Sequence, residues 1–288
     1  LKTFDIQTIS NHWSKIMGSD NLGNLSLNYQ SIMYEGVVYP PFIKPEALAL
    51  LRNQHTLRSN DIVIAAYPKC GTTWMQQIVL TLLADGDGSK VRLPMGMSPW
   101  LEAWVSSQGL AAFEERHPEK TGWNGLENSG DLNPSWSPSR RVLKTHAPSQ
   151  LAPWVDGAGR NGVNSARVIV VTRNPKDVAV SHYYHTIDLP HIFQYNGSWD
   201  HFLTNLWIPG KVESGSFWEW HQSWWQVCQG GSVDLLWISY EELLSEPEKS
   251  ISRVTKFIGL EPTTELTKGV LTASNFQAMK QTLSLIHI

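Results

Sequence analysis

Short apolar runs alternate with amphipathic segments through most of the chain. Four such runs predict buried strands, at residues 61–67, 140–146, 167–172 and 233–239. After the first run, Trp74, Ile78 and Leu82 recur at helical spacing, which predicts a helix directly behind that strand. Strands that alternate with helices in this way favour a parallel sheet with helices on both faces. The pattern therefore predicts one α/β domain.

Further helices are expected around these strands. The segments with helical spacing are residues 45–52, 217–228 and 247–258. Another helix should begin after Asn174, because Asn-Pro-Lys-Asp supplies an N-cap, a proline at the first position and an acid at the third. Residues 33–41 are typical of extended chain, and residues 85–139 are typical of lids and short helices.

Four polar side chains fall at or just past the carboxyl ends of the predicted strands. They are Lys69, His146, Arg173 and Tyr240. In an open parallel sheet these ends meet along one edge, and ligands bind beyond that edge. The sequence therefore predicts a site there.

The turn after the first strand reads Pro-Lys-Cys-Gly-Thr-Thr-Trp, residues 68–74. The N–H groups that open the following helix can bind an anion, and the hydroxyls of Thr72 and Thr73 add donors. This predicts a P-loop-like sheet. A nucleotide-kinase loop, however, has its lysine after the last glycine, whereas Lys69 precedes Gly71. The alternative is a tight strand-to-helix turn with a surface lysine.

Two more polar groups could bind a second phosphate. Arg173 lies directly before a predicted helix, and Ser181 follows about two helical turns later. The planar guanidinium of arginine suits bidentate binding of phosphate. A surface salt bridge is the alternative interpretation of Arg173.

Lys144 and His146 are two positions apart on the second strand, so their side chains should point to the same face. Histidine is the usual general base near neutral pH. A structural histidine is the alternative, but the position opposite the anion loop favours the base. Trp74, beside the loop, could stack on a purine, and Trp100 could line an apolar acceptor pocket.

Composition narrows the expected partners. The net charge of -3 gives no general attraction to nucleic acid or to anionic membranes, so neither is expected. No apolar run reaches the ~18 residues of a transmembrane helix. Cys70 and Cys228 form no metal-binding spacing and no disulfide framework, which favours a reducing, cytoplasmic compartment.

Five stretches resemble, in order and spacing, the cytosolic sulfotransferases. They are YPKCGTTW, RVLKTH, VIVVTRNPKDVAVSHYYH, ISYEELLSEP and SNFQAMK, within roughly residues 30–282. That family transfers the sulfuryl group of 3'-phosphoadenosine 5'-phosphosulfate (PAPS) to a hydroxyl or amine of a small molecule. The resemblance implies this cofactor, a phenol, alcohol or amine as acceptor, and no metal.

The resemblance also implies a role for each matching residue. His146 matches the catalytic base, and Lys144 matches the lysine beside it. Arg173 and Ser181 resemble the clamp on the 3'-phosphate. The other cofactor positions are Lys69, Cys70, Gly71, Thr72, Thr73 and Trp74 around the phosphosulfate, with Trp74 against the adenine, and Tyr240, Ser274 and Phe276 around adenine and ribose.

The implied mechanism is an in-line attack of the acceptor oxygen on sulfur, with His146 taking the acceptor proton. Lys69 and Lys144 stabilise the charge on the bridging and sulfuryl oxygens. Magnesium is not required, because a sulfuryl group carries less charge than a phosphoryl group. The acceptor pocket is expected within residues 31–43, 96–106 and 185–215.

Two departures from the family pattern bear on function. Cys70 stands where the family often has another small residue, and its position at a helix N-terminus beside Lys69 predicts a lowered thiol pKa and a redox-sensitive site. A tolerated small residue is the alternative. The family's last basic motif, Arg-Lys-Gly, and its dimerisation motif would both follow Lys280 and are absent. We therefore expect weak cofactor binding or an inactive chain, and a homodimer only in the parent protein.

Residues 283–288 back-translate to CTGTCTCTTATACACATC, a transposase adapter sequence used in DNA library preparation. We therefore expect an incomplete sulfotransferase domain over residues 1–282 and a non-native tail after it. A natural short tail is the alternative.

Two other functions stay open. A small-molecule P-loop kinase would need a lysine after Gly71 and a carboxylate for magnesium, and the sequence shows neither. A non-catalytic nucleotide-binding remnant is the other, because the last basic motif is missing.

Overall fold

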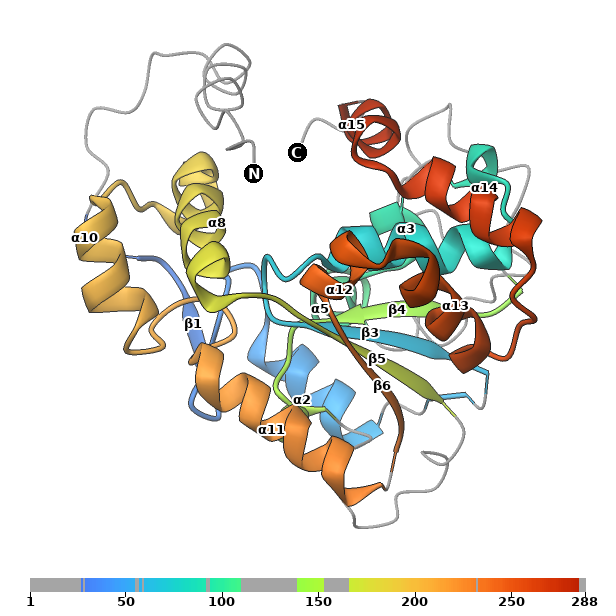
Figure 1. Cartoon of the computed structure of the whole chain (residues 1–288). Helices are drawn as coiled ribbons and strands as arrows, with labels where there is room; N and C mark the ends of the chain where they lie inside the picture. The colour runs from blue at the N-terminus through green and yellow to red at the C-terminus, as the bar shows by residue number, and fades with distance from the viewer. Residues whose placement is uncertain are drawn as a thin grey trace.

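The computed structural model describes residues 27, 29–54, 57–58, 60–91, 94–109, 139–152, 166–231 and 233–284. Four parallel strands form the central sheet, in the order β4-β3-β5-β6 (Figure 1). They are β3 (Ile62–Ala66), β4 (Val142–Thr145), β5 (Arg167–Thr172) and β6 (Asp234–Ser239). All four predicted strands and the parallel α/β sheet are confirmed.

β3 lies inside the sheet, between β4 and β5. All of its residues are buried, which suits a continuous apolar run. The chain passes from β3 to β4 on one side and later returns to place β5 on the other, so the strand order reverses at β3. Such a reversal leaves a crevice beyond the strand ends. The carboxyl end of β3 is therefore where this fold favours a ligand.

Helices cover both faces of the sheet. In Figure 1, α3 (Thr72–Leu83), α12 (Tyr240–Ser245) and α13 (Pro247–Phe257) lie on one side of the strands. On the other side lie α2 (Pro45–Gln54) and α11 (Phe217–Gly230). The remaining helices are α4 (Pro94–Met97), α5 (Leu101–Gln108), α8 (Pro175–Asp188), α9 (Pro190–Phe193), α10 (Trp199–His201), α14 (Thr264–Ser274) and α15 (Phe276–Ser284). The described residues also form the short 3-10 turns η1 (Gly88–Lys90) and η2 (Ser149–Leu151) and the π-helical turn η4 (Phe202–Trp207). Within the described segments, we find no helix with the length and apolar character needed to cross a membrane.

Local residues set the element ends as predicted. The Asn174 side chain accepts a hydrogen bond from the Lys176 N–H, and Pro175 opens α8. The stretch expected to be extended forms an antiparallel hairpin of β1 (Ile32–Tyr34) and β2 (Val37–Tyr39). Residues 110–138 of the expected lid segment and residues 285–288 of the expected tail lie outside the described residues.

The buried apolar side chains form two groups. The larger one surrounds the sheet. The smaller one, here named the hairpin core, joins the hairpin to α2 and to the segment after β4. Its buried members are Val37, Tyr39, Ile43, Leu48, Ala147 and Leu151, with Trp100 packed against them.

The amino-terminal edge of the sheet holds a buried ion pair. Asp61 and Arg141 directly precede β3 and β4, and their side chains are 0% and 2% exposed. The Arg141 Nε donates to Asp61 Oδ1 at 2.7 Å, and Arg141 Nη2 donates to Oδ2. The Arg58 N–H donates to the same carboxylate at 2.7 Å. Both carboxylate oxygens therefore have donors.

Candidate active site

The loop between β3 and α3 passes through the left-handed backbone region twice, with Lys69 at φ 70° and Gly71 at φ 101°. A side chain at Gly71 would not fit, because its Cβ would lie 2.8 Å from the ring of Tyr240. The Cys70 N–H donates to the Tyr67 carbonyl at 3.1 Å and ties the loop to the strand. The result is a tight turn that starts α3 beside Tyr240.

The first turn of α3 has no capping side chain, because glycine occupies the N-cap. The first N–H groups of a helix have no acceptor within the helix, and the helix dipole places partial positive charge there. Thr72 is buried and Thr73 is half-buried at the same end. This end of α3 therefore suits an anion.

Two lysines lie at the same edge of the sheet, and burial lowers the pKa of both. The pKa of Lys69 falls because the side chain is withdrawn from water; the Glu213 carboxylate opposes this shift and the Arg173 guanidinium adds to it. Burial likewise lowers the pKa of Lys144 to about 8. Neither ammonium group forms an ion pair with a described residue. A bound anion would stabilise both charges.

His146 directly follows β4, and a hydrogen bond from its ring to the end of β3 fixes its orientation. Nδ1 lies 2.6 Å from the Ala66 carbonyl oxygen, which can only accept, so Nδ1 carries the proton. The neutral ring therefore has Nε2 free to accept a proton. The pKa of His146 lies well below its ordinary value because of burial, and the nearby Lys144 charge adds to the shift. This is the state that a general base needs.

Trp100 lies against both of these predicted residues. Its ring meets His146 edge-on at 5.1 Å between centroids, and the Lys144 ammonium lies 5.0 Å from the ring centroid. The ring of Phe42 contacts Trp100 from another side, at 5.8 Å. Trp100, expected to line an acceptor pocket, thus forms an apolar wall beside the histidine.

Arg173, Tyr240 and Trp74 form a layer beside the loop. The guanidinium carbon lies 4.4 Å from the Tyr240 ring centroid, and the Trp74 ring meets the same tyrosine at 5.1 Å. Arg173 Nη1 donates to the Lys69 carbonyl at 3.2 Å. Arg173 Nε and Trp74 Nε1 are buried without a hydrogen-bond partner among the described residues. Buried donors normally have partners, so these two are suited to a ligand.

Residues 59–287 match a known family, described as the sulfotransferase domain. The chain belongs to the sulfotransferase family. It is 31% identical to sulfotransferase 2B1 of Mus musculus over 273 residues, which cover 93% of this chain and 70% of that protein. It is also 31% identical to sulfotransferase 1E1 of Cavia porcellus over 225 residues, covering 77% of this chain and 67% of that protein. The resemblance drawn from five motifs is confirmed.

Solved sulfotransferase structures share the fold. A mouse sulfotransferase, SULT7A1, solved with PAP, matches with a TM-score of 0.64 at 22% identity, over 87% of this chain and 77% of that one. Retinol dehydratase, solved with androsterone and the inactive cofactor PAP, matches with a TM-score of 0.66 at 20% identity, over 96% of this chain and 80% of that one. These likenesses support the expected P-loop-like sheet.

Three predicted cofactor residues of this sulfotransferase lie on helices away from the loop in sequence. Ser181 is half-buried on α8. Ser274 ends α14, where its buried hydroxyl donates to the Val270 carbonyl at 2.7 Å. Phe276 begins α15 and is 54% exposed. Neither serine forms a hydrogen bond with the described loop residues, so their cofactor roles stay predictions.

The expected lowered pKa of Cys70 is wrong. The side chain is fully buried, and burial raises the thiol pKa, because a thiolate would have to form away from water. The Arg173 charge opposes this shift without overcoming it. Cys70 is therefore a small buried residue, which is the alternative considered above.

One acidic residue of the site was missed in the sequence. Glu213 is 4% exposed, and burial raises its pKa to about 7 although Lys144 and Lys69 both favour its ionised form. Its Oε2 lies 3.9 Å from His185 Nε2. Glu213 stands in the irregular segment before α11, without periodicity or motif, so no sequence pattern indicated its burial.

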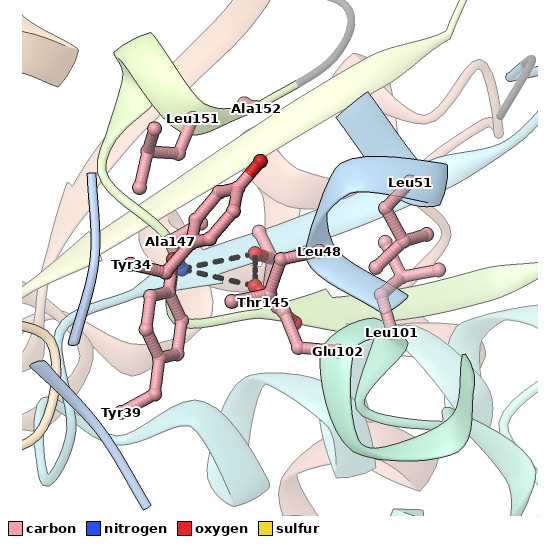
Figure 2. A pocket seen from close by; sticks show the side chains of 10 residues that line it. All are labelled: Tyr34, Tyr39, Leu48, Leu51, Leu101, Glu102, Thr145, Ala147, Leu151 and Ala152. Atoms are coloured by element: carbon pink, nitrogen blue, oxygen red, sulfur yellow. Dashed lines mark hydrogen bonds between the residues drawn. The ribbon is translucent and has the colours of Figure 1, made fainter. Parts of the chain in front are cut away.

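A second missed carboxylate, Glu102, lines a small pocket in the hairpin core (Figure 2). The pocket walls are Tyr34, Tyr39, Leu48, Leu51, Leu101, Glu102, Thr145, Ala147, Leu151 and Ala152. In Figure 2, dashed lines join the Glu102 carboxylate, the Thr145 hydroxyl and the Ala147 N–H. This carboxylate thus contacts both neighbours of His146.

Among the described residues, no group of three His, Cys, Asp or Glu side chains could hold a metal ion.

Proposed function

We propose that this sulfotransferase transfers the sulfuryl group of PAPS to a hydroxyl or amine of a small apolar acceptor, with His146 as general base. The observation that carries the proposal is the neutral His146, with Nε2 free, beside two half-buried lysines and an uncapped helix N-terminus. An anionic donor group and a proton acceptor are both needed for sulfuryl transfer to oxygen or nitrogen.

The cofactor assignment rests on the fit of the unpartnered groups. The N-terminus of α3, with Lys69, would bind the phosphosulfate. Arg173 with Ser181 would bind the 3'-phosphate, for which the free Nε of Arg173 is suited. Trp74 and Tyr240 would flank the adenine, with Ser274 and Phe276 nearby. PAP in the structures of SULT7A1 and retinol dehydratase is consistent with this cofactor.

The reaction forms one bond and breaks one. The acceptor oxygen bonds to sulfur while the bond from sulfur to the bridging phosphate oxygen breaks, which leaves adenosine 3',5'-bisphosphate. His146 Nε2 takes the acceptor proton. Lys69 and Lys144 stabilise the charge on the departing oxygen. Because bound anions favour protonated bases, the cofactor should also raise the low pKa of His146 toward the working range.

The acceptor class follows from the wall around His146. Trp100 and Phe42 offer apolar ring faces, which suit a phenol or an apolar alcohol. Androsterone and retinol, bound in retinol dehydratase, fit that description of shape and polarity. An amine acceptor, a homodimeric parent protein and a cytoplasmic location stay predictions.

Thermal unfolding with added ligands tests the cofactor. Adenosine 3',5'-bisphosphate without magnesium should raise the melting temperature. A shift only with ATP and magnesium would contradict the proposal and favour a kinase.

Turnover of a phenol panel tests the base. His146→Ala should lose about 10²- to 10⁴-fold in kcat while binding adenosine 3',5'-bisphosphate as before. Binding without turnover in the unmodified chain would favour the non-catalytic remnant. Equal turnover in the variant and the unmodified chain would refute the role of His146.

A further inference from the structure

Side chains of other elements hold the main chain of His146 and Ala147 by hydrogen bonds. The Trp220 Nε1 donates to the His146 carbonyl at 2.9 Å, and the Trp224 Nε1 donates to the Ala147 carbonyl at 3.1 Å. The ring is fixed by the Ala66 carbonyl. The Ala147 N–H is shared between Thr145 Oγ1 at 3.0 Å and Glu102 Oε1 at 3.2 Å.

Glu102 is an unusual residue for this position. It lies in the first turn of α5, where the helix dipole favours a negative charge, yet only 3% of its surface is exposed. Burial raises its pKa, and the hydrogen bonds from Thr145 and Ala147 oppose this rise without cancelling it. A carboxylate is costly to bury unless it is bonded. Its bonds to the two neighbours of His146 are therefore the reason that this position tolerates it.

A second contact ties the same helix to the same strand. The Lys144 N–H donates to the Pro99 carbonyl at 2.9 Å, and Trp100 pairs with Lys144 as an isolated parallel bridge. Trp100 is the N-cap of α5, and its ring contacts His146. Residues 99–102 thus contact Lys144, His146 and the residues on either side of His146.

We propose that Glu102 is a positioning residue, whose carboxylate fixes the Thr145–Ala147 turn so that His146 Nε2 points into the acceptor site. Successive residues of an extended chain face opposite sides, so Thr145 and Ala147 turn toward Glu102 while His146 turns away. Glu102 therefore acts through the backbone rather than on the reacting atoms.

The hydrogen bonds, rather than the charge, carry this role. Glu102 Oε1 accepts both bonds, and an amide oxygen could do the same. The other oxygen, Oε2, is buried without a partner among the described residues and faces the pocket that Tyr39 also lines (Figure 2). The Tyr39 hydroxyl is likewise buried there without a partner.

A matched pair of variants separates bonds from charge. Glu102→Gln and Glu102→Leu both remove the charge, but only the first keeps the acceptor. We expect Glu102→Gln to retain kcat within about twofold, because its amide oxygen accepts the same bonds. We expect Glu102→Leu to lose about tenfold in kcat, with acceptor KM and cofactor-product binding within about twofold, because a small displacement of the base is enough.

The pH dependence of kcat gives a second test of the positioning role of Glu102. A loosened His146 is less buried, so its depressed pKa should rise, and the acid limb of the kcat profile should move to higher pH in Glu102→Leu only. Ser106→Ala is the control on α5, since the Ser106 hydroxyl contacts Lys44 N–H and the Glu102 carbonyl but not the turn. It should leave the profile unchanged. If Glu102→Leu does not fold, Thr145→Val removes the bond from Thr145 to Glu102, and with it the bond from the Ala147 N–H to the Thr145 hydroxyl, with a smaller change of shape.

This inference rests on the role proposed for His146, but one measurement tests it without turnover. Nitrogen NMR of labelled histidine, assigned with His146→Ala, reports which ring nitrogen carries the proton. The unmodified chain and Glu102→Gln should show the Nδ1–H form, and Glu102→Leu or Thr145→Val should show a mixture of forms. The proposal would be overturned if Glu102→Leu and Thr145→Val both kept the spectrum and the kcat of the unmodified chain. An equal loss of kcat in Glu102→Gln and Glu102→Leu would overturn it as well. Failure of the proposed function would instead show as an inactive unmodified chain with the NMR pattern intact.

Discussion

The amino-terminal and carboxyl-terminal edges of the central sheet, where the strands begin and end, differ in how their charged side chains are paired. At the amino-terminal edge, Asp61 and Arg141 are buried together, and both carboxylate oxygens receive donors. At the carboxyl-terminal edge, Lys69 and Lys144 are half-buried, with lowered pKa values and without an ion pair among the described residues. The Asp61 carboxylate thus has its partners within the protein, whereas the two lysines have no ion-pair partner among the described residues.

The difference separates stability from function. A buried charge that has its partner holds two strands in place, and removing the partner is expensive. A buried charge without its partner lowers the stability of the unliganded protein but binds an anion strongly when one arrives. The sequence alone does not show whether a given lysine or aspartate will have an ion-pair partner within the folded protein.

Breaking the Asp61–Arg141 pair should have the largest effect on stability. Asp61→Ala removes the carboxylate of a buried pair and should lower the free energy of unfolding by about 3–5 kcal/mol. Urea unfolding measures the change. A loss below about 1 kcal/mol would mean that the pair behaves as an exposed one.

The same kind of change at the other edge should act on binding instead. Lys69→Met should leave the free energy of unfolding unchanged or higher, since a half-buried charge without an ion-pair partner is removed. It should weaken binding of adenosine 3',5'-bisphosphate by about 10- to 100-fold, the value of one or two charge-assisted hydrogen bonds. Lys268→Met, at an exposed position of α14, is the control and should change neither. Destabilisation by Lys69→Met as large as that of Asp61→Ala would remove the distinction between the edges.

The pH dependence of stability sharpens the comparison further. The folded pKa of Lys144 is about 8, below its ordinary value of 10.5. Between these values the unfolded chain binds more protons, so stability should rise with pH through this window, by on the order of 1–3 kcal/mol. Lys144→Met should remove the rise. A flat curve in the unmodified chain would show that Lys144 reaches water.

The smallest expected effect concerns Cys70. Its buried thiol should react with a thiol reagent more slowly than the half-buried Cys228, by about 100-fold or more if it opens only by local unfolding. Mass spectrometry of labelled peptides measures both rates in one sample. Faster labelling of Cys70 would restore the redox-sensitive site predicted from the sequence.

The strands and the loop could be predicted because their physics is local. A buried parallel strand is a continuous apolar run, as in β3, and the turn Pro-Lys-Cys-Gly-Thr-Thr needs glycine where Tyr240 closes on it. The position of His146 at a strand end followed from the same pattern.

The errors and omissions depend on tertiary packing. The thiol pKa of Cys70 was predicted from its place at a helix N-terminus, but its burial under the sheet edge reverses the direction. Glu102 looks like an ordinary first-turn acid of a helix, and only the packing of α5 on β4 turns it toward Ala147. Glu213 has no local pattern at all.

Proton uptake on ligand binding tests the central claim most directly. At pH 8 the phosphates of adenosine 3',5'-bisphosphate are fully ionised, since their second pKa is about 6. Lys144, with a pKa of about 8, should be half protonated before binding and protonated afterwards. Titration calorimetry in two buffers of different ionisation enthalpy should therefore show uptake of about half a proton, and Lys144→Met should abolish it. Binding with no uptake, or with release of protons, would contradict the claim that the lysines at the carboxyl-terminal ends of the strands form an anion-binding site.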